Sequence, residues 1–425
     1  MTATVALELP DGARILVPDA PDLVTPYVLR EQGDWFEDEV RYLRRLLRPG
    51  EQAIDIGASY GVYTLAMAKA VGPGGRVWAF EPAPDTAALL ARSLQANGFV
   101  HAVLERSAVA ARAGSGRLSI HANSELNALV EGDAAGVTVP LTTLDDCLER
   151  FGWHAIDVLK IDAEGAESDI LRGGRRFFAQ LSPLVLYEVR KGSALRLELA
   201  EEFAELGYGA YRLVPGLGLL VPFDAGEPAD GFLLNLFGCK PEGAVRLAAR
   251  GALVQAAVPP RGVPGKTVVE QALALHALSR DAARPPAERL GALEAAFVRL
   301  RNLWEADPSP AGAASLARVA QEFGERSIAC IALMWLSGTL QRGPAELREP
   351  FLAPGARFDA VPHGGRLHDW LLAAALEELE RLGSLSSFYG DAGTLPRLEA
   401  IRRLGYGSDE MARRLDLVRQ RANAA

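Results

Sequence analysis

Cysteine and histidine are scarce, and neither stands in a metal-binding pattern. The three cysteines, Cys147, Cys239 and Cys330, are widely spaced and odd in number, which argues against a disulfide framework and against a structural zinc site. The six histidines are scattered, and no two stand four residues apart, the spacing that would place two ligands on one face of a helix. We therefore predict no bound metal ion and a location in the reducing cytoplasm.

Long hydrophobic runs are also lacking. The longest spans residues 328–336, far short of the roughly 18 residues that a membrane span needs. Residues 1–12 lack the basic stretch and the apolar core of a secretory signal. These two absences predict a soluble, non-secreted protein without a membrane span.

The sequence has no excess of basic residues. Lysine and arginine number 45 against 54 aspartates and glutamates, a formal net charge of −9 with a pI near 5.4. This balance gives no reason to expect nucleic-acid binding and fits a small or neutral substrate better. Hydrophobic residues at 49% and charged residues at 23% are the proportions of an ordinary globular protein. At about 150 residues per domain, a chain of 425 residues predicts two or three domains.

The first half of the chain has the pattern of an α/β domain. Alternating hydrophobic residues on both sides of Asp11-Gly12 predict a hairpin within residues 1–18, and a hydrophobic stripe predicts a helix over 34–47. Apolar runs predict strands over 53–56, 76–80, 102–106, 156–161 and 184–189. Helices are predicted between them over 62–70, 85–97 and 165–173, the second with Asp85 as its N-cap. Apolar strands that alternate with helices indicate a parallel sheet covered on both faces.

The first domain is predicted to close with an antiparallel pair of strands at 208–220 and 232–239. Beyond it the composition shifts to Ala, Leu, Arg and Glu, and apolar residues recur at spacings of three and four, which predicts helices. A solenoid of helical repeats is one interpretation of this part, although no two copies align at a fixed period. The predicted domains are an N-terminal hairpin and helix over 1–50, the α/β domain over 51–241 and an α-helical domain over 242–425.

A glycine-bearing turn follows the strand at 53–56. Residues 53–61 read Ala-Ile-Asp-Ile-Gly-Ala-Ser-Tyr-Gly, and a helix is predicted next. Such a turn lets the backbone approach a ligand and directs free helix N–H groups at a negative group. Gly57 and Gly61 form a G-x-x-x-G pattern and not the G-x-G-x-x-G of dinucleotide enzymes. Asp55, just before the turn, suits a ligand with an amino group.

Glu81 ends the next predicted strand, about 20 residues after Gly57, the separation at which an acidic residue binds the hydroxyls of a ribose. Any ribose-bearing cofactor would satisfy this arrangement. The alternative is that Asp55 and Glu81 are merely exposed carboxylates at strand ends. We favour a binding role because both fall at the carboxyl edge of the sheet, where open α/β sheets bind their ligands.

A third acidic segment follows the strand at 156–161. Asp162 stands at its carboxyl end, where it would face the reactive end of a ligand bound at the first turn. Glu164 and Glu167 fall in the first turn of the next predicted helix, where acidic side chains stabilise the helix dipole. For Glu167 we favour that structural role. Glu188 closes a further strand on the same edge.

Together these segments resemble the FkbM family of class I S-adenosylmethionine-dependent methyltransferases. The similar segments are AIDIGASYGVYTLAMA from Ala53, RVWAFEPAPDTAALLARSLQANG from Arg76, LTTLDDCLERFGWHAIDVLKIDAEGAESDILRGG from Leu141 and PLVLYEV from Pro183. The resemblance extends over about residues 25–240 and implies a Rossmann-like class I methyltransferase sheet, mostly parallel with an antiparallel closing strand. With the helical remainder, the predicted fold class is this α/β sheet followed by an all-α C-terminal domain.

The resemblance implies S-adenosyl-L-methionine as the cofactor and S-adenosyl-L-homocysteine as its product. It also implies a place for each candidate residue along the cofactor. Carboxylates and aromatic faces are favourable neighbours of the positive sulfonium. The predicted neighbours are Asp55 at the amino group; Gly57, Ala58, Ser59, Tyr60 and Gly61 at the methionine end; Tyr63 and Asp162 at the sulfonium; Glu81 at the ribose; and Ser107 and Ala108 at the adenine. Ser59 stands where the family has an asparagine.

The predicted reaction is O-methyl transfer to a glycan or to a sugar-bearing or polyketide-type metabolite, the acceptors that the resemblance implies. Methyl transfer requires a nucleophilic oxygen about 3 Å from the methyl carbon. A hydroxyl acceptor also needs a base within hydrogen-bond reach. Asp162 is the first candidate for this base, Glu188 the second and His121 the third.

Other interpretations stay open at this point. N-methylation would use the same scaffold, and a nicotinamide-dependent oxidoreductase is disfavoured by the missing third glycine. A degenerate methyltransferase module, with the helical half as an interaction scaffold, is opposed by the presence of Asp55, Glu81 and Asp162. The helical domain could also bind a protein partner or form a homodimer.

Overall fold

In the computed structural model, residues 3–424 are described except 122, 131–135, 192–193 and 348. The chain divides into two compact units. The first comprises residues 1–212, 222–228 and 233–250, and the second comprises 213–221, 229–232 and 251–425. The domain boundaries predicted from the sequence stay predictions.

The N-terminal segment contains a hairpin and two helices. The predicted hairpin is confirmed: β1 (Thr4–Glu8) pairs antiparallel with β2 (Arg14–Pro18). The helix predicted over 34–47 is shorter, since α2 spans Asp38–Leu46. A further helix, α1 (Val24–Gln32), was not predicted. The residues between the two helices are therefore irregular, and they include Trp35 and Glu37.

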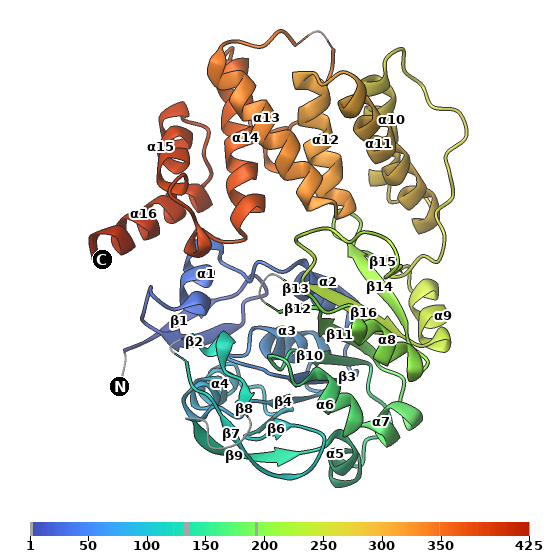
Figure 1. The fold of residues 1–425 in the computed structure, drawn as a ribbon, viewed down its shortest axis with the longest axis vertical. Coiled ribbons are helices and arrows are strands. Elements are labelled where there is room, and N and C mark those ends of the chain that lie inside the picture. The colour runs from blue at the N-terminus through green and yellow to red at the C-terminus, as the bar shows by residue number, and fades with distance from the viewer. Residues whose placement is uncertain (1–2, 122, 131–135, 192–193, 348, 425) are drawn as a thin grey trace. The chain divides into compact units, whose positions relative to one another are not determined.

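An eight-stranded sheet has the order β15-β14-β16-β11-β10-β3-β4-β5 (Figure 1), and its parallel strands belong to the first unit. The strands β11, β10, β3, β4 and β5 pair in parallel, whereas β16 is antiparallel to both β11 and β14. Their bounds are β3 Gln52–Ile56, β4 Arg76–Phe80, β5 Ala102–Glu105, β10 Val158–Ile161, β11 Leu184–Glu188, β14 Gly209–Val214, β15 Leu219–Pro222 and β16 Asn235–Cys239. The predicted fold class is confirmed, with a mostly parallel sheet and an antiparallel closing strand.

Helices connect the strands of the sheet. They are α3 Val62–Val71, α4 Pro84–Ala96, α5 Leu144–Phe151, α6 Glu167–Arg172, α7 Arg175–Gln180, α8 Glu198–Glu205 and α9 Pro241–Ala249. Asp85 was predicted as the N-cap of α4, but the N-cap is Ala83 and Pro84 occupies the first turn. Proline fits there because the first helical N–H groups have no partner within the helix.

A second, four-stranded sheet of order β6-β9-β7-β8 was not predicted. Its strands are β6 Ala108–Val109, β7 Gly114–Leu118, β8 Leu129–Val130 and β9 Val137–Thr142. A short helical turn, η1 (Ser124–Leu126), lies between β7 and β8. A two-stranded pair, β12 (Arg190–Lys191) with β13 (Ala194–Leu195), completes the strands.

Aromatic side chains fill much of the core beneath the sheet. Phe177, Phe178, Phe203 and Tyr187 are almost fully buried. Phe177 and Phe178 meet edge to face with ring centroids 5.1 Å apart, a geometry that aromatic quadrupoles favour. This packing fixes β10 and β11, whose carboxyl ends contribute to the site described below.

The second unit is helical, with α10 Val268–Arg280, α11 Pro286–Ala306, α12 Pro310–Phe323, α13 Arg326–Arg342, α14 Leu367–Ser384, α15 Thr394–Leu404 and α16 Asp409–Ala424. Successive helices pack against one another along the chain (Figure 1). Short 3-10 turns, η2 (Ala356–Ala360) and η3 (Ser387–Tyr389), flank α14. The all-α character of this part is confirmed. Among the described residues, no helix is long and apolar enough to cross a membrane.

Buried ion pairs hold the last helices of this unit together. Arg414 on α16 is 1% exposed and Glu380 on α14 is 0% exposed. The Arg414 guanidinium donates to the Glu380 backbone carbonyl at 3.0 Å and to the Glu410 carboxylate at 3.1 Å. Arg397 also pairs with the Glu380 carboxylate at 2.9 Å, so removing Arg414 leaves this buried acid with one of its two cations, and losing a partner of a buried pair is costly.

We predict that Arg414→Ala lowers the free energy of unfolding by on the order of 3 kcal/mol, because the buried Glu380 loses a donor. Thermal and urea denaturation of the full chain would measure the loss. Arg403→Ala is the matched control, since Arg403 is exposed on α15 and exposed changes usually stay within about 0.5 kcal/mol. Equal stability of the two variants would contradict the structural role of Arg414.

Candidate functional site

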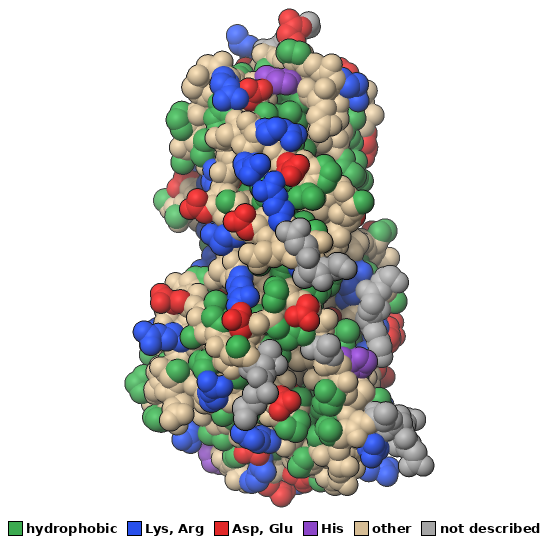
Figure 2. All heavy atoms as spheres, turned by 90° about the vertical axis from the view of Figure 1, so that its left-hand side faces the viewer, with side chains coloured by type: hydrophobic (Ala, Val, Ile, Leu, Met, Phe, Trp, Pro, Cys, Tyr) green, Lys and Arg blue, Asp and Glu red, His purple; other side chains and the backbone are tan. Residues whose placement is uncertain are grey.

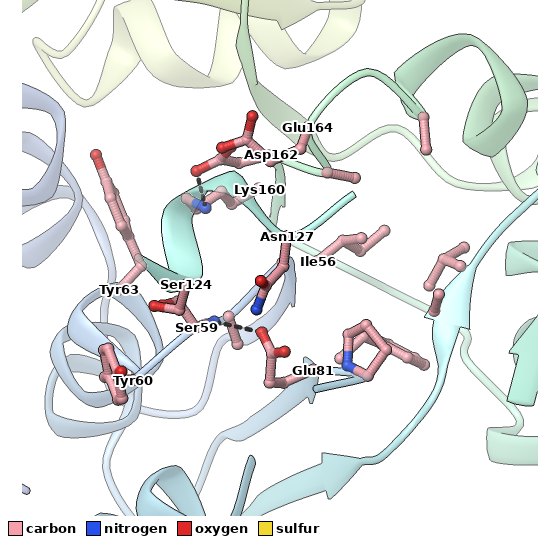
Figure 3. A pocket seen from close by; sticks show the side chains of 18 of the residues that line it. Ile56, Ser59, Tyr60, Tyr63, Glu81, Ser124, Asn127, Lys160, Asp162 and Glu164 are labelled. Carbon is pink, nitrogen blue, oxygen red and sulfur yellow. Dashed lines mark hydrogen bonds and ion pairs between the residues drawn. The ribbon is translucent and has the colours of Figure 1, made fainter. Parts of the chain in front are cut away.

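A pocket opens at the carboxyl edge of the parallel strands, and Figure 3 shows the side chains around it. About 980 Å³ in and around it is not filled by atoms, a volume that includes open solvent. Nine of the eleven predicted cofactor residues line it: Gly57, Ala58, Ser59, Tyr60, Tyr63, Glu81, Ser107, Ala108 and Asp162. The sheet topology brings these residues together from four separate segments of the chain.

The glycine-bearing turn between β3 and α3 is tightly packed. Gly57 has a φ of +75°, and a Cβ there would lie 1.7 Å from the Asp162 backbone oxygen. Only glycine fits, because the ends of β3 and β10 lie too close together for a side chain at this position. Ser59 is also left-handed with a φ of 48°, a conformation that asparagine adopts more readily. Gly61, with a φ of 98°, is the N-cap of α3.

The Glu81 carboxylate is held by two backbone N–H groups. Ser59 N–H donates to Oε2 and Ala83 N–H donates to Oε1, each at 2.8 Å. Burial raises the pKa of Glu81 to about 7, although these two bonds act to lower it. Each carboxylate oxygen keeps a further lone pair. Glu81 can therefore accept hydrogen bonds from a ligand in the pocket.

Lys160 lies between two carboxylates at the junction of β3 and β10. It is the parallel register partner of Asp55, and its ammonium is 3.7 Å from Asp55 Oδ1 and 2.9 Å from Asp162 Oδ2. Burial acts to lower the pKa of Lys160, but the Asp162 and Asp55 carboxylates outweigh it, so the pKa is raised. Lys160 thus stays charged. The Tyr63 ring lies 5.0 Å from the same ammonium.

Asp55 lies beneath the turn and not on the pocket wall. It is 0% exposed, its Oδ2 accepts a hydrogen bond from Thr64 at 2.5 Å, and its Oδ1 accepts none. Burial raises the pKa of Asp55, while Lys160 lowers it. The structure therefore places Asp55 behind the pocket surface and next to Lys160.

Three carboxylates meet beside the pocket at the ends of β10 and β11. One oxygen each of Asp162, Glu164 and Glu188 lies within 4.8 Å of the other two. Burial, followed by the charges of Asp162 and Glu164, raises the pKa of Glu188 to about 9. We assign no metal ion to this group because the Lys160 ammonium already pairs with Asp162 and would repel a second cation.

Two of the base candidates lie off the pocket wall. Glu188 is half-buried next to Asp162, whereas His121 is exposed and its backbone N–H donates to Asn127.

Glu167 has a structural role, as the sequence suggested: its carboxylate accepts from the N–H groups of Ala163 and Gly165 and pairs with Arg196 at 2.8 Å.

Several pocket residues were missed from the sequence. Trp35 and Glu37 precede α2, Thr25 lies at the start of α1, and Ser124 and Asn127 lie around η1. Ser124 contacts Ser59 at 3.3 Å between hydroxyl oxygens. Neither segment has a spacing that marks a site. Lys160 had a signal, since a lone lysine within an apolar strand is rarely buried without a carboxylate partner.

The comparison with known families decides the identity of this segment. Residues 55–209 match the model described as the methyltransferase FkbM domain. This segment is a methyltransferase FkbM domain. The resemblance inferred from the sequence motifs is confirmed for this segment.

Two characterised relatives match the FkbM region. Methyltransferase sdnD of Sordaria araneosa is 28% identical over 192 residues, which is 37% of this chain and 74% of that protein. The 31-O-demethyl-FK506 methyltransferase FkbM of Streptomyces tacrolimicus is 29% identical over 204 residues, which is 39% of this chain and 74% of that protein.

Solved structures match at lower identity. A SAM-dependent O-methyltransferase from Thermotoga maritima is 14% identical with a TM-score of 0.28, and the match covers 56% of this chain and 77% of that one. Aeropyrum pernix fibrillarin, in complex with S-adenosyl-L-methionine, is 13% identical with a TM-score of 0.30, covering 56% of this chain and 100% of that one. The family assignment depends on the sequence match and not on these structures.

We predict that Lys160→Met lowers the free energy of unfolding by about 3–5 kcal/mol near neutral pH, because Asp55 keeps a buried charge without its cation. Losing Lys160 raises the pKa of Asp55 further. A raised folded-state pKa costs stability as pH rises above the ordinary value of 3.8. The deficit should therefore shrink as pH falls toward that value.

Urea denaturation at several pH values would measure this deficit. Lys69→Met is the matched control, since Lys69 is exposed on α3. A deficit independent of pH would show that Asp55 is not the group that Lys160 compensates.

Proposed function

We propose that this protein is an S-adenosyl-L-methionine-dependent O-methyltransferase that acts on a hydroxyl of a glycan or of a sugar-bearing or polyketide-type metabolite. The observation that supports this most is the convergence of the glycine turn, Glu81, Ser107 and Asp162 on one pocket within an FkbM domain. The name of one relative, 31-O-demethyl-FK506 methyltransferase, agrees with an oxygen acceptor on such a metabolite.

The pocket fits this cofactor on its own chemistry. Ser107 Oγ is buried, has no hydrogen-bond partner and belongs to a pocket residue, so a ligand heteroatom such as one on adenine would satisfy it. Glu81 offers free lone pairs to two ribose hydroxyls. Asp55 lies behind the pocket wall, so its contact with the amino group stays a prediction. Two polar positions on the wall thus match the adenine and the ribose of one molecule.

The residues are proposed to divide along the pocket. The adenine end lies at Ser107 and Ala108, the ribose at Glu81, and the methionine end at the turn that includes Gly57, Ala58, Ser59, Tyr60 and Gly61. S-adenosyl-L-methionine supplies an electrophilic methyl group on a positive sulfur. Asp162 and Tyr63 lie at the other end from Ser107 along the sheet order, and their negative charge and aromatic face favour that positive centre.

Asp162 is the one sequence-derived base candidate on the pocket wall. Glu188 lies behind it in the carboxylate group, and His121 is exposed and away from the lining. We therefore place Asp162 at the acceptor side and give Glu188 and His121 lower priority as bases. N-methylation on the same scaffold is the second candidate reaction, since no described residue distinguishes a nitrogen from an oxygen acceptor.

The remaining expectations concern partners and location. On the face that Figure 2 shows, acidic and basic side chains are interspersed and do not gather into a basic stripe among the described residues. We still predict that this protein has no nucleic-acid partner and that it is cytoplasmic. So does binding of a protein partner or a second copy through the helical domain.

We expect S-adenosyl-L-homocysteine to bind saturably with micromolar affinity and NAD not to bind. Isothermal calorimetry of the purified full chain with each compound would test this directly. Binding of NAD alone would favour the oxidoreductase. Binding of neither compound would favour the degenerate module, in which the helical part carries the function.

We expect Glu81→Ala to weaken S-adenosyl-L-homocysteine binding by about 1.5–3 kcal/mol for each charge-assisted hydrogen bond lost. Since the pKa of Glu81 is about 7 and ribose hydroxyls bind the ionised form, wild-type affinity should fall below that pH and Glu81→Ala affinity should not. Glu105→Ala is the matched control, because Glu105 ends β5 but pairs with Arg150 outside the pocket. Equal effects of the two changes would refute the ribose assignment.

A further inference from the structure

Glu37 is a carboxylate of the pocket wall that comes from the N-terminal segment and not from the sheet. It is half-buried, directly precedes α2 and lines the pocket with Trp35. We infer that Glu37 takes the proton of the acceptor hydroxyl during methyl transfer. This inference rests on the proposed function and assigns its base.

Contacts place Glu37 at the reactive end of the pocket. The Tyr63 hydroxyl donates a hydrogen bond to Glu37 Oε2, and the Tyr63 ring lies 5.0 Å from the Lys160 ammonium. Asp162 and Lys160 both influence the ionisation of Glu37. Figure 3 shows Lys160 and Asp162 at one end of the pocket and Glu81 at the other. Glu37 therefore lies with the acceptor-side residues and away from the ribose position.

Asp162 is already engaged by another side chain. Its Oδ2 accepts a hydrogen bond from the Lys160 ammonium at 2.9 Å, which leaves fewer of its lone pairs for an acceptor hydroxyl. Glu37 is held by two neutral side chains instead, Tyr63 and Trp35, and a carboxylate has about four lone-pair sites, so others stay open to an acceptor hydroxyl.

The surroundings of Glu37 also raise its affinity for a proton. Burial raises the pKa of Glu37, the Tyr63 hydrogen bond lowers it and the Asp162 charge raises it again, with a net upward shift. A base works best when its pKa lies near the operating pH. The titratable groups that interact with it are Tyr63 on α3, Lys160 and Asp162 at β10, Glu39 on α2 and Glu188 at the end of β11.

The step balances in atoms and electrons. The acceptor oxygen forms the new bond to the methyl carbon while the bond from that carbon to sulfur breaks, and the electron pair stays on sulfur. The acceptor proton passes to the Glu37 carboxylate, which later returns it to solvent. The products are the methyl ether, S-adenosyl-L-homocysteine and one proton.

Turnover by variants provides the first test. A panel of methyl pyranosides would be screened with S-adenosyl-L-methionine, and release of S-adenosyl-L-homocysteine would be followed against pH. Glu37→Gln should lower kcat by about 100-fold or more and remove the acid limb of the pH profile, with binding of S-adenosyl-L-homocysteine unchanged. Asp38→Asn is the matched control, because Asp38 is the next residue and pairs with Arg41 at the surface.

Two further variants distinguish Glu37 from its neighbours. Tyr63→Phe removes a hydrogen bond that lowers the pKa of Glu37, so the acid limb should move to higher pH and remain present. Asp162→Asn should retain the acid limb. A native kcat in Glu37→Gln, or loss of the acid limb in Asp162→Asn alone, would overturn the assignment.

A binding measurement tests Glu37 without any acceptor. A cationic sulfonium disfavours the protonated form of a neighbouring carboxylate, so S-adenosyl-L-methionine should release more protons on binding than S-adenosyl-L-homocysteine at pH values above the ordinary carboxyl value of 4.5. Calorimetry in buffers of different ionisation enthalpy measures this difference. The difference should shrink in Glu37→Gln and persist in Asp38→Asn, and an unchanged difference in Glu37→Gln would overturn the assignment.

The outcomes separate this inference from the proposed function. If S-adenosyl-L-homocysteine does not bind the wild-type protein, the proposed function fails. If it binds, and Glu37→Gln behaves as the wild type in proton release and in turnover, only the role of Glu37 fails. If it binds and no pyranoside is methylated, the hydroxyl acceptor fails, and with it the assigned proton transfer.

Discussion

The position of one ammonium group determines how the whole site is built. Lys160 lies where two parallel strands end, between a fully buried carboxylate and one on the pocket wall. Without it, Asp55 and Asp162 would repel each other in a region largely excluded from water, where desolvated charges are costly. With it, two acids can stand close together at the sheet edge. The other acidic residues of the site are arranged around this compensated pair.

Different partners also explain why the carboxylates of one pocket can differ in their chemistry. The Asp162 carboxylate pairs with the Lys160 ammonium, Glu81 accepts hydrogen bonds from backbone N–H groups, and Glu37 accepts one from a phenol hydroxyl. These partners differ in how strongly they favour the ionised form. A site with several acids can in this way assign binding to one, orientation to another and proton transfer to a third.

The sequence predicted the parts of the site that depend on strand ends. Asp55, Glu81 and Asp162 could be located because apolar strands are easy to recognise and parallel strands end at one edge. The glycine turn was visible for a related reason, since Gly57 leaves no room for a side chain. Features that follow from topology and close packing were therefore accessible from the order of residues alone.

The rest of the site depends on contacts that have no periodic pattern. Glu37 and Trp35 lie in an irregular segment that resembles the start of a helix, and Ser124 and Asn127 lie around a short turn. The small sheet from β6 to β9 was missed because its strands are short and contain several glycine and polar residues. Which loop covers a pocket is decided by tertiary packing, which overrides local preference.

The N-terminal segment has a consequence for how such proteins are divided. The family match begins at residue 55, yet Thr25, Trp35 and Glu37 form part of the pocket wall. The matched segment contains the glycine turn, Glu81 and Asp162, and under the proposed function the preceding stretch completes the acceptor side. Two proteins with the same FkbM domain could therefore differ in their acceptors through changes in the segment before it, while every residue of the domain stays the same.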